Sequence, residues 1–169
     1  MKVLLVDGYN LIYGHPRLSG LVDRDPDSAR EGLLKELSCL ASPNYYQLVM
    51  VVFDAAGSRR PEPVIEDRGG ITVVFTRRSQ SADSFIEAAV RRLVPGSEVE
   101  VATSDRVLAN MVAGFGARSV DGASMLGMAQ EALIETRGEM RRLPGSRRAP
   151  LEDRVSEEVR HLLDQMRYQ

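Results

Sequence analysis

The sequence predicts an α/β fold in which helices cover both faces of a central, mainly parallel sheet. Segments with the spacing of strands alternate along the chain with segments of helical spacing, and this order is typical of parallel sheets. The strand segments are continuous apolar runs, which indicates strands that are buried on both faces. At 169 residues, with 43% hydrophobic and 27% charged residues, the chain fits one globular domain.

The predicted strands are short apolar runs, most of them rich in β-branched residues. They lie at residues 2–6, 48–53, 71–75, 99–102 and 117–120. Residues 55–70 are rich in glycine, proline and charge, and this composition predicts a loop. Ligands of parallel sheets bind beyond the carboxyl ends of the strands, so we expect a functional site where these apolar runs end.

Apolar residues at helical spacing predict the helices between and after these strands. The predicted helices start at Pro26 (capped by Asp25), at Ala82, after Asp105, and at Gly122. Residues 144–150 contain two prolines and a glycine and predict a linker, and residues 151–168 carry the apolar stripe of a last helix. We therefore expect a domain at residues 1–143, followed by a linker and a C-terminal helix at 144–169 that packs on the same domain.

Acidic residues follow the predicted strands at widely separated points of the chain. They are Asp7, Asp54, Asp105, and Asp83 with Glu87 one helical turn further on. Carboxylates gathered at one sheet edge raise each other's pKa unless a cation compensates. Mg²⁺ or Mn²⁺ is the expected cation, because hard ions prefer carboxylate and water oxygens. The structural alternatives are helix capping for Asp83 and Asp105 and a turn for Asp54.

Four motifs along the chain match a known family in order. They are Asp7-Gly8-Tyr9-Asn10, Val52-Phe53-Asp54, Ser81-Ala82-Asp83 with Ile86-Glu87, and Ala102-Thr103-Ser104-Asp105. Together they resemble the NYN domain family, and more narrowly its YacP-type bacterial branch in the PIN-like nuclease superfamily. The resemblance covers residues 1–143 and implies a single PIN-like domain that cleaves RNA as a metal-dependent endoribonuclease.

The resemblance also implies roles for individual residues. It implies that Asp7, Asp83 and Asp105 hold the metal ion, that Asn10 belongs to the catalytic set and orients Asp7 or a metal-bound water, and that Asp54 and Glu87 are supporting acids. Its implied substrate is messenger RNA, with the translating ribosome as a further partner.

Two arginine pairs lie in predicted loops beside these acids, although the net charge of −2 does not indicate a nucleic-acid binder. Arg59 and Arg60 follow Asp54, and Arg77 and Arg78 precede Asp83. Arginine binds phosphate through two hydrogen bonds, so we expect both pairs to contact the RNA backbone.

Two other functions are weighed against the nuclease. A catalytically silent RNA-binding module of the same fold is disfavoured because every acid of the set is present. A receiver-like phospho-acceptor domain could use Asp54 at the end of a strand. Such a domain needs an acidic pair after the first strand and a late lysine, but Gly8 follows Asp7 and no lysine follows Lys35.

Composition and cysteine content predict a cytoplasmic protein without a membrane segment. No apolar run approaches the roughly 20 residues that a membrane-spanning helix needs. The single Cys39 cannot form an internal disulfide, which fits a reducing compartment. The sequence leaves the oligomeric state open.

Overall fold

The computed structural model describes residues 1–55 and 62–142, and its described strands form one sheet. The six strands are β1 (Lys2–Asp7), β2 (Leu48–Phe53), β3 (Val64–Arg68), β4 (Ile71–Phe75), β5 (Glu98–Ala102) and β6 (Arg118–Val120). They are arranged in the order β3-β4-β2-β1-β5-β6. Neighbouring strands are parallel except for the antiparallel pair β3 and β4. The predicted mainly parallel sheet is confirmed.

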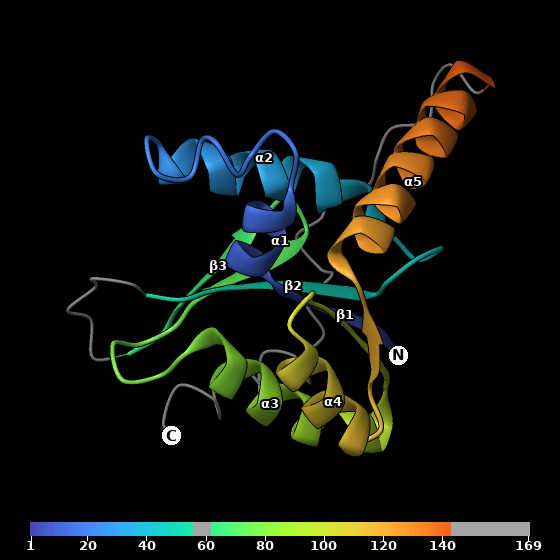
Figure 1. The fold of residues 1–169 in the computed structure, drawn as a ribbon. Coiled ribbons are helices and arrows are strands. Elements are labelled where there is room, and N and C mark those ends of the chain that lie inside the picture. The colour runs from blue at the N-terminus through green and yellow to red at the C-terminus, as the bar shows by residue number, and fades with distance from the viewer. Residues whose placement is uncertain (56–61, 143–169) are drawn as a thin grey trace.

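Helices cover both faces of the sheet, as the sequence predicts. The α-helices are α1 (Gly8–Gly14), α2 (Pro26–Leu37), α3 (Ala82–Leu93), α4 (Arg106–Gly114) and α5 (Gly122–Arg142). Figure 1 shows α1, α2 and α5 on one face and α3 and α4 on the other. Each face has its own apolar core: Leu4 and Val6 of β1 belong to one, and Val3 and Leu5 to the other. This alternation explains why residues 3–6 of β1 are all apolar, since successive side chains point to opposite faces.

The order in which successive strands are added to the sheet reverses next to β1. After β1 it adds β2 and β4 on one side, and α3 then leads back to β5 on the other side of β1. The strand order therefore reverses between β1 and β5, and α/β sheets bind ligands at the carboxyl ends of the strands on either side of such a reversal. Asp7 ends β1, and Asp105 follows β5.

The prediction of a loop at residues 55–70 is wrong in part, because this segment contains the strand β3. Val64 and Ile65 begin this strand, but Glu66, Asp67 and Arg68 follow them directly. An edge strand has only one neighbour, so it can carry charged residues that a buried strand cannot. A tight turn at Gly69 and Gly70, with φ of 65° and 89°, connects it to β4.

The structure differs from the sequence prediction in two further places. The first strand extends by one residue to Asp7, and the seven-residue helix α1 follows where no helix was predicted. The predicted linker and C-terminal helix at 144–169 lie outside the described residues. Among the helices that the structure does describe, none is long and apolar enough to cross a membrane.

Candidate active site at the carboxyl edge of the sheet

Asp7 is a buried acid between β1 and α1. Its side chain is 8% exposed, and it caps α1 by accepting a hydrogen bond from the Asn10 backbone N to Oδ1 at 3.2 Å. The next residue must be small, because a Cβ on Gly8 would lie 2.3 Å from Cε1 of the Phe53 ring. Gly8 thus lets α1 start directly against the sheet, which places Asp7 at the reversal point.

Asp105 caps α4 on the other side of that point. Its Oδ1 accepts hydrogen bonds from the backbone N of Val107 at 2.7 Å and of Leu108 at 3.3 Å. Its own backbone N donates to Oγ1 of the buried Thr103 at 3.1 Å. The capping alternative for Asp105 is therefore present in the structure, and it fixes the carboxylate at the sheet edge rather than removing it.

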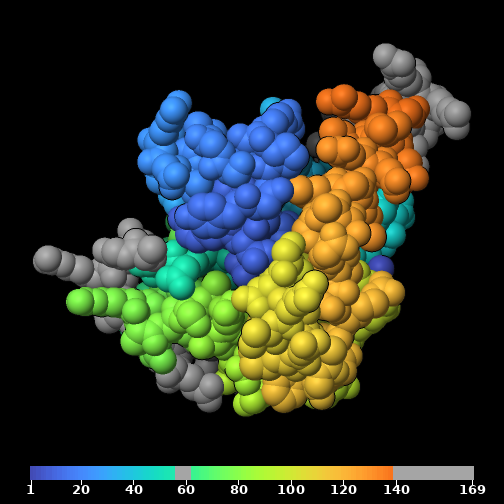
Figure 2. Space-filling view, in the orientation of Figure 1, coloured from blue at the N-terminus to red at the C-terminus, as the bar shows by residue number. Residues whose placement is uncertain are grey.

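Asp83 and Asp54 complete the group of acids. Asp83 is half-buried in the first turn of α3, whose N-cap is Ser81. Asp54 is exposed directly after β2. Figure 2 shows the start of α1 (blue), the turn into α3 (green) and the segment into α4 (yellow) meeting on one face of the molecule.

The pKa values of Asp7 and Asp83 are raised, in part by the charges of neighbouring carboxylates. Burial raises the pKa of Asp7 from 3.8 to about 6, and the charges of Asp83, Asp105 and Asp54 add to this rise, while the hydrogen bond from Asn10 opposes it. Burial also raises the pKa of Asp83, with further contributions from the charges of Asp105 and Asp54. The charges of three aspartates from separate segments therefore all act on Asp7, and we call Asp7, Asp54, Asp83 and Asp105 the acid centre.

Glu87 is not part of this electrostatic group. It lies one turn after Asp83 on α3 but forms an ion pair with Arg91, and it is absent from the charges that act on Asp7 and Asp83. Arg91 also lies over the Phe115 ring, 4.4 Å from its centroid. The structure thus gives Glu87 a local partner, and its supporting role stays a prediction.

Asn10 connects the two sides of the acid centre. Its side-chain Oδ1 accepts a hydrogen bond from the Ser104 backbone N at 2.7 Å, and its own backbone N holds Asp7. The Ser104 Oγ in turn accepts from the Gly122 backbone N at 3.3 Å. The side chain of Asn10 therefore positions the segment before Asp105, and only its backbone orients Asp7.

The structure describes two of the four arginines that were predicted to bind phosphate. Arg77 is half-buried and Arg78 is exposed, and both lie between β4 and α3, directly before the segment that carries Asp83. Arg59 and Arg60 lie outside the described residues.

The donor chemistry of the acid centre fits a hard divalent cation. All of its ionisable donors are carboxylates, and their mutual repulsion favours a compensating charge. No three His, Cys, Asp or Glu side chains among the described residues are grouped closely enough to hold a metal ion by themselves. Mg²⁺ needs no such group, because it usually keeps several waters and binds through one or two carboxylates.

Sequence reasoning missed two threonines that shape this edge. Thr76 is buried, and its Oγ1 accepts from the Ala55 backbone N at 3.1 Å, which fixes the chain just after Asp54. Thr103 supports Asp105 in the same way. Each directly follows an apolar run, so a rule that searched strand ends for hydroxyls as well as carboxylates would have found both.

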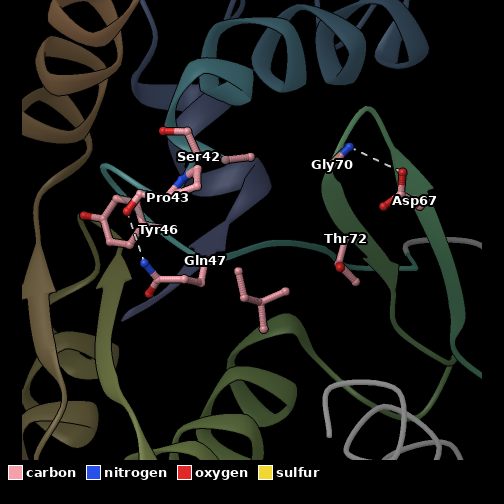
Figure 3. Close-up of a pocket in the computed structure, with 9 residues that line it drawn as sticks. Ser42, Pro43, Tyr46, Gln47, Asp67, Gly70 and Thr72 are labelled. Atoms are coloured by element: carbon pink, nitrogen blue, oxygen red, sulfur yellow. Dashed lines mark hydrogen bonds between the residues drawn. The ribbon is translucent and has the colours of Figure 1, made fainter. Parts of the chain in front are cut away.

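A pocket at the opposite edge of the sheet does not belong to this site. It lies where β2 and β4 begin and is lined by Tyr46, Gln47, Asp67 and Thr72, among others (Figure 3). Asp67 is engaged by the backbone N of Gly70 at 3.3 Å. No member of the acid centre lines it.

An α/β sheet with aspartates gathered beside its reversal point fits the nuclease-like class of domain that the four sequence motifs indicate. Within that class, the chain belongs to the YacP-like NYN domain family, whose sequence model matches residues 4–168. This match spans both sides of the predicted boundary at 143/144. The chain therefore carries a ribonuclease-type domain, and the recognition from its four motifs is confirmed.

Individual relatives agree with this assignment. The uncharacterized protein YacP of Bacillus subtilis strain 168 is 34% identical over 106 residues, which are 62% of this chain and 61% of that protein, less than two thirds of its length. The crystal structure of Rae1 (YacP) from Bacillus subtilis is similar with a TM-score of 0.70 at 26% identity, over 98% of this chain and 94% of that one. A mutant of the same protein gives 0.68 at 26% identity, over 98% and 99%.

Proposed function

We propose that this protein is a metal-dependent endoribonuclease that hydrolyses RNA phosphodiester bonds at the acid centre. The observation that carries the proposal is the gathering of carboxylates around the buried Asp7: burial raises its pKa to about 6, and the charges of Asp83, Asp105 and Asp54 add to this rise. A fold that only had to be stable would gain nothing from gathering like charges beside a buried carboxylate. Membership of a nuclease-like family supports the same conclusion.

Mg²⁺ or Mn²⁺ is the proposed cofactor, held by Asp7, Asp83 and Asp105, of which one or two bind the ion directly and the others act through its waters. When bound, such an ion supplies an activated water and relieves negative charge on the scissile phosphate. Asp7 is the principal ligand in this proposal, because its burial and its neighbours make its ionised form the most dependent on a compensating cation. Asp54 adds negative charge at the rim.

The remaining residues hold this arrangement and the substrate. Asn10 keeps the ends of β1 and β5 at a fixed separation through Ser104, so that Asp7 and Asp105 face one substrate together. Arg77 and Arg78 lie in the turn before Asp83, where they bind RNA phosphates in this proposal. We extend it to messenger RNA on the translating ribosome in the cytoplasm, which the resemblance of the four motifs supports.

The test is single-turnover cleavage of an end-labelled single-stranded RNA by the purified protein. Cleavage should require Mg²⁺ or Mn²⁺, stop in EDTA and return when the metal is restored. Asp105→Asn should abolish it with the fold intact, because asparagine also caps a helix well.

The matched control is Asp25→Asn. Asp25 likewise caps a helix, through the Ser28 backbone N, and it is not among the charges that act on Asp7. It should therefore keep full activity. Cleavage that persists in EDTA would refute metal dependence, and RNA binding without cleavage under every metal condition would favour the silent RNA-binding module.

A further inference from the structure

A pocket of about 350 Å³ adjoins the acid centre through Asp54 and Tyr9. It lies between α2 and the ends of β2 and β4 and reaches β3. Its lining also includes Arg30, Phe75 and Thr76. Its volume is within the range of small-ligand pockets, roughly 300–1,000 Å³. Apart from Asp54, no described residue of the proposed cleavage chemistry lines this pocket.

Aromatic rings form the apolar part of the pocket, and one guanidinium lies over them. The Arg30 guanidinium lies over the Phe75 ring, 5.5 Å from its centroid, and the Phe53 ring packs against Phe75 at 5.7 Å. Tyr9 meets Phe53 edge-on at 5.2 Å. Tyr9 and Phe75 are each only partly buried and line the pocket, so part of each ring borders the space that a ligand would occupy.

The guanidiniums of the pocket are already engaged. Arg30 donates to the Tyr9 hydroxyl at 2.7 Å and pairs with Asp27. Arg68 pairs with Glu66 at 2.7 Å and with Glu31 at 2.6 Å. Three carboxylates (Asp27, Asp54 and Glu66) line the pocket with these two guanidiniums. A lining with an excess of negative charge disfavours a phosphate group.

We propose that this pocket binds one unstacked nucleobase of the RNA and prefers bases with an exocyclic amino group. The partly buried rings of Tyr9 and Phe75 offer stacking surface at the pocket wall, as aromatic side chains do in single-stranded nucleic-acid sites. The carboxylates accept hydrogen bonds from an amino group such as that of cytosine. Uracil presents a carbonyl oxygen at that position, which carboxylates repel. The substrate in this proposal is RNA, so this part rests on the proposed function.

The direct test compares CMP with UMP, which differ at position 4 of the base (amino group against carbonyl) and at the adjacent N3 (acceptor against N–H donor). Binding to the wild-type protein is measured by NMR titration in EDTA, with ribose 5-phosphate as a third ligand. CMP should bind about tenfold more tightly than UMP, the worth of one hydrogen bond to a charged acceptor, and ribose 5-phosphate should not compete. Equal affinities for CMP and UMP, or competition by ribose 5-phosphate, would overturn the proposal.

Two matched phenylalanine variants test whether CMP binds in this pocket. Phe75→Leu should reduce CMP binding towards that of UMP, whereas Phe115→Leu should not. Both phenylalanines are half-buried with an arginine over the ring, but Phe115 lies at the far end of α4 from Asp105. Equal losses in both variants would contradict the assignment to this pocket.

Cleavage mapping on a random-sequence RNA separates this inference from the proposed function. Wild type should show depletion of uracil at one fixed position relative to the cut, and Phe75→Leu should cut without it. A CMP preference in a protein that cleaves no RNA would refute the nuclease and retain the base pocket. Cleavage without any positional preference would refute the pocket and retain the nuclease.

Discussion

The side chain of Asn10 and the backbone of Ser104 are joined by a 2.7 Å hydrogen bond across 94 positions of the sequence. This bond ties the start of α1 to the segment between β5 and α4. Because the same Asn10 holds Asp7 through its backbone N, and Asp105 directly follows Ser104, the bond sets the separation of two carboxylates of the acid centre.

Replacing Asn10 should therefore impair activity more than stability. In Asn10→Ala, loss of one hydrogen bond should lower the free energy of unfolding by about 1 kcal/mol. Cleavage should fall by about a hundredfold, because small displacements of catalytic groups are costly. Urea unfolding and single-turnover cleavage measure the two effects. Asn110→Ala, at an exposed position of α4, is the control, and an Asn10→Ala protein as active as this control would be inconsistent with a positioning role.

Asp7 should make the metal-free protein less stable as the pH rises. Its pKa is about 6 in the folded protein, above the ordinary value of 3.8 for an aspartate, so the folded state binds the proton more tightly. The resulting stabilisation is complete below pH 3.8 and is lost as the pH rises through about 6. At about 1.36 kcal/mol per pKa unit, the loss is on the order of 3 kcal/mol.

Asp7→Asn isolates this effect, because asparagine does not ionise and can still accept the hydrogen bond from Asn10. In EDTA, the variant should be more stable than wild type at about pH 7.5 and equally stable near pH 4. Thermal unfolding followed by circular dichroism across this range gives the difference. A difference that does not change with pH would show that ionisation of Asp7 is not its cause.

Arg78 should contribute to RNA affinity through a phosphate contact. Each such contact to a single strand adds roughly 0.7 to the slope of log affinity against log salt concentration. Arg78→Ala should therefore weaken binding and reduce the slope by about this amount, as measured by fluorescence anisotropy with Ca²⁺ in place of the active metal. Arg137→Ala, an exposed arginine on α5, should leave the slope unchanged. Identical slopes for Arg78→Ala and wild type would place the RNA elsewhere.

The sequence revealed those features that depend on local pattern. Asp7 and Asp105 stand out because carboxylates directly end or follow apolar runs, and the register of parallel strands then brings them to one edge. The strand β3 was missed because its charged half reads as a loop, and α1 because its seven residues are too few for helical periodicity to show.

Contacts between distant segments could not be predicted from the sequence. The stacking of Arg30 from α2 on Phe75 from β4 depends on how the helix lies across the sheet, and no spacing along the chain records that. The bond between Asn10 and Ser104 is of the same kind. The ion pair of Glu87 with Arg91 differs, because its i,i+4 spacing on a helix can be read from the sequence.

Mn²⁺ binding to the purified protein, measured from the decrease of the free-ion signal in electron paramagnetic resonance, tests whether the acid centre is a metal site. Wild type should bind Mn²⁺, and Mg²⁺ should compete. Asp7→Asn should weaken binding by more than about tenfold, since even the loss of a ligand's supporting partner costs that much, while Asp25→Asn should bind as wild type does. Equal Mn²⁺ affinity in wild type and Asp7→Asn would contradict a metal site at the acid centre.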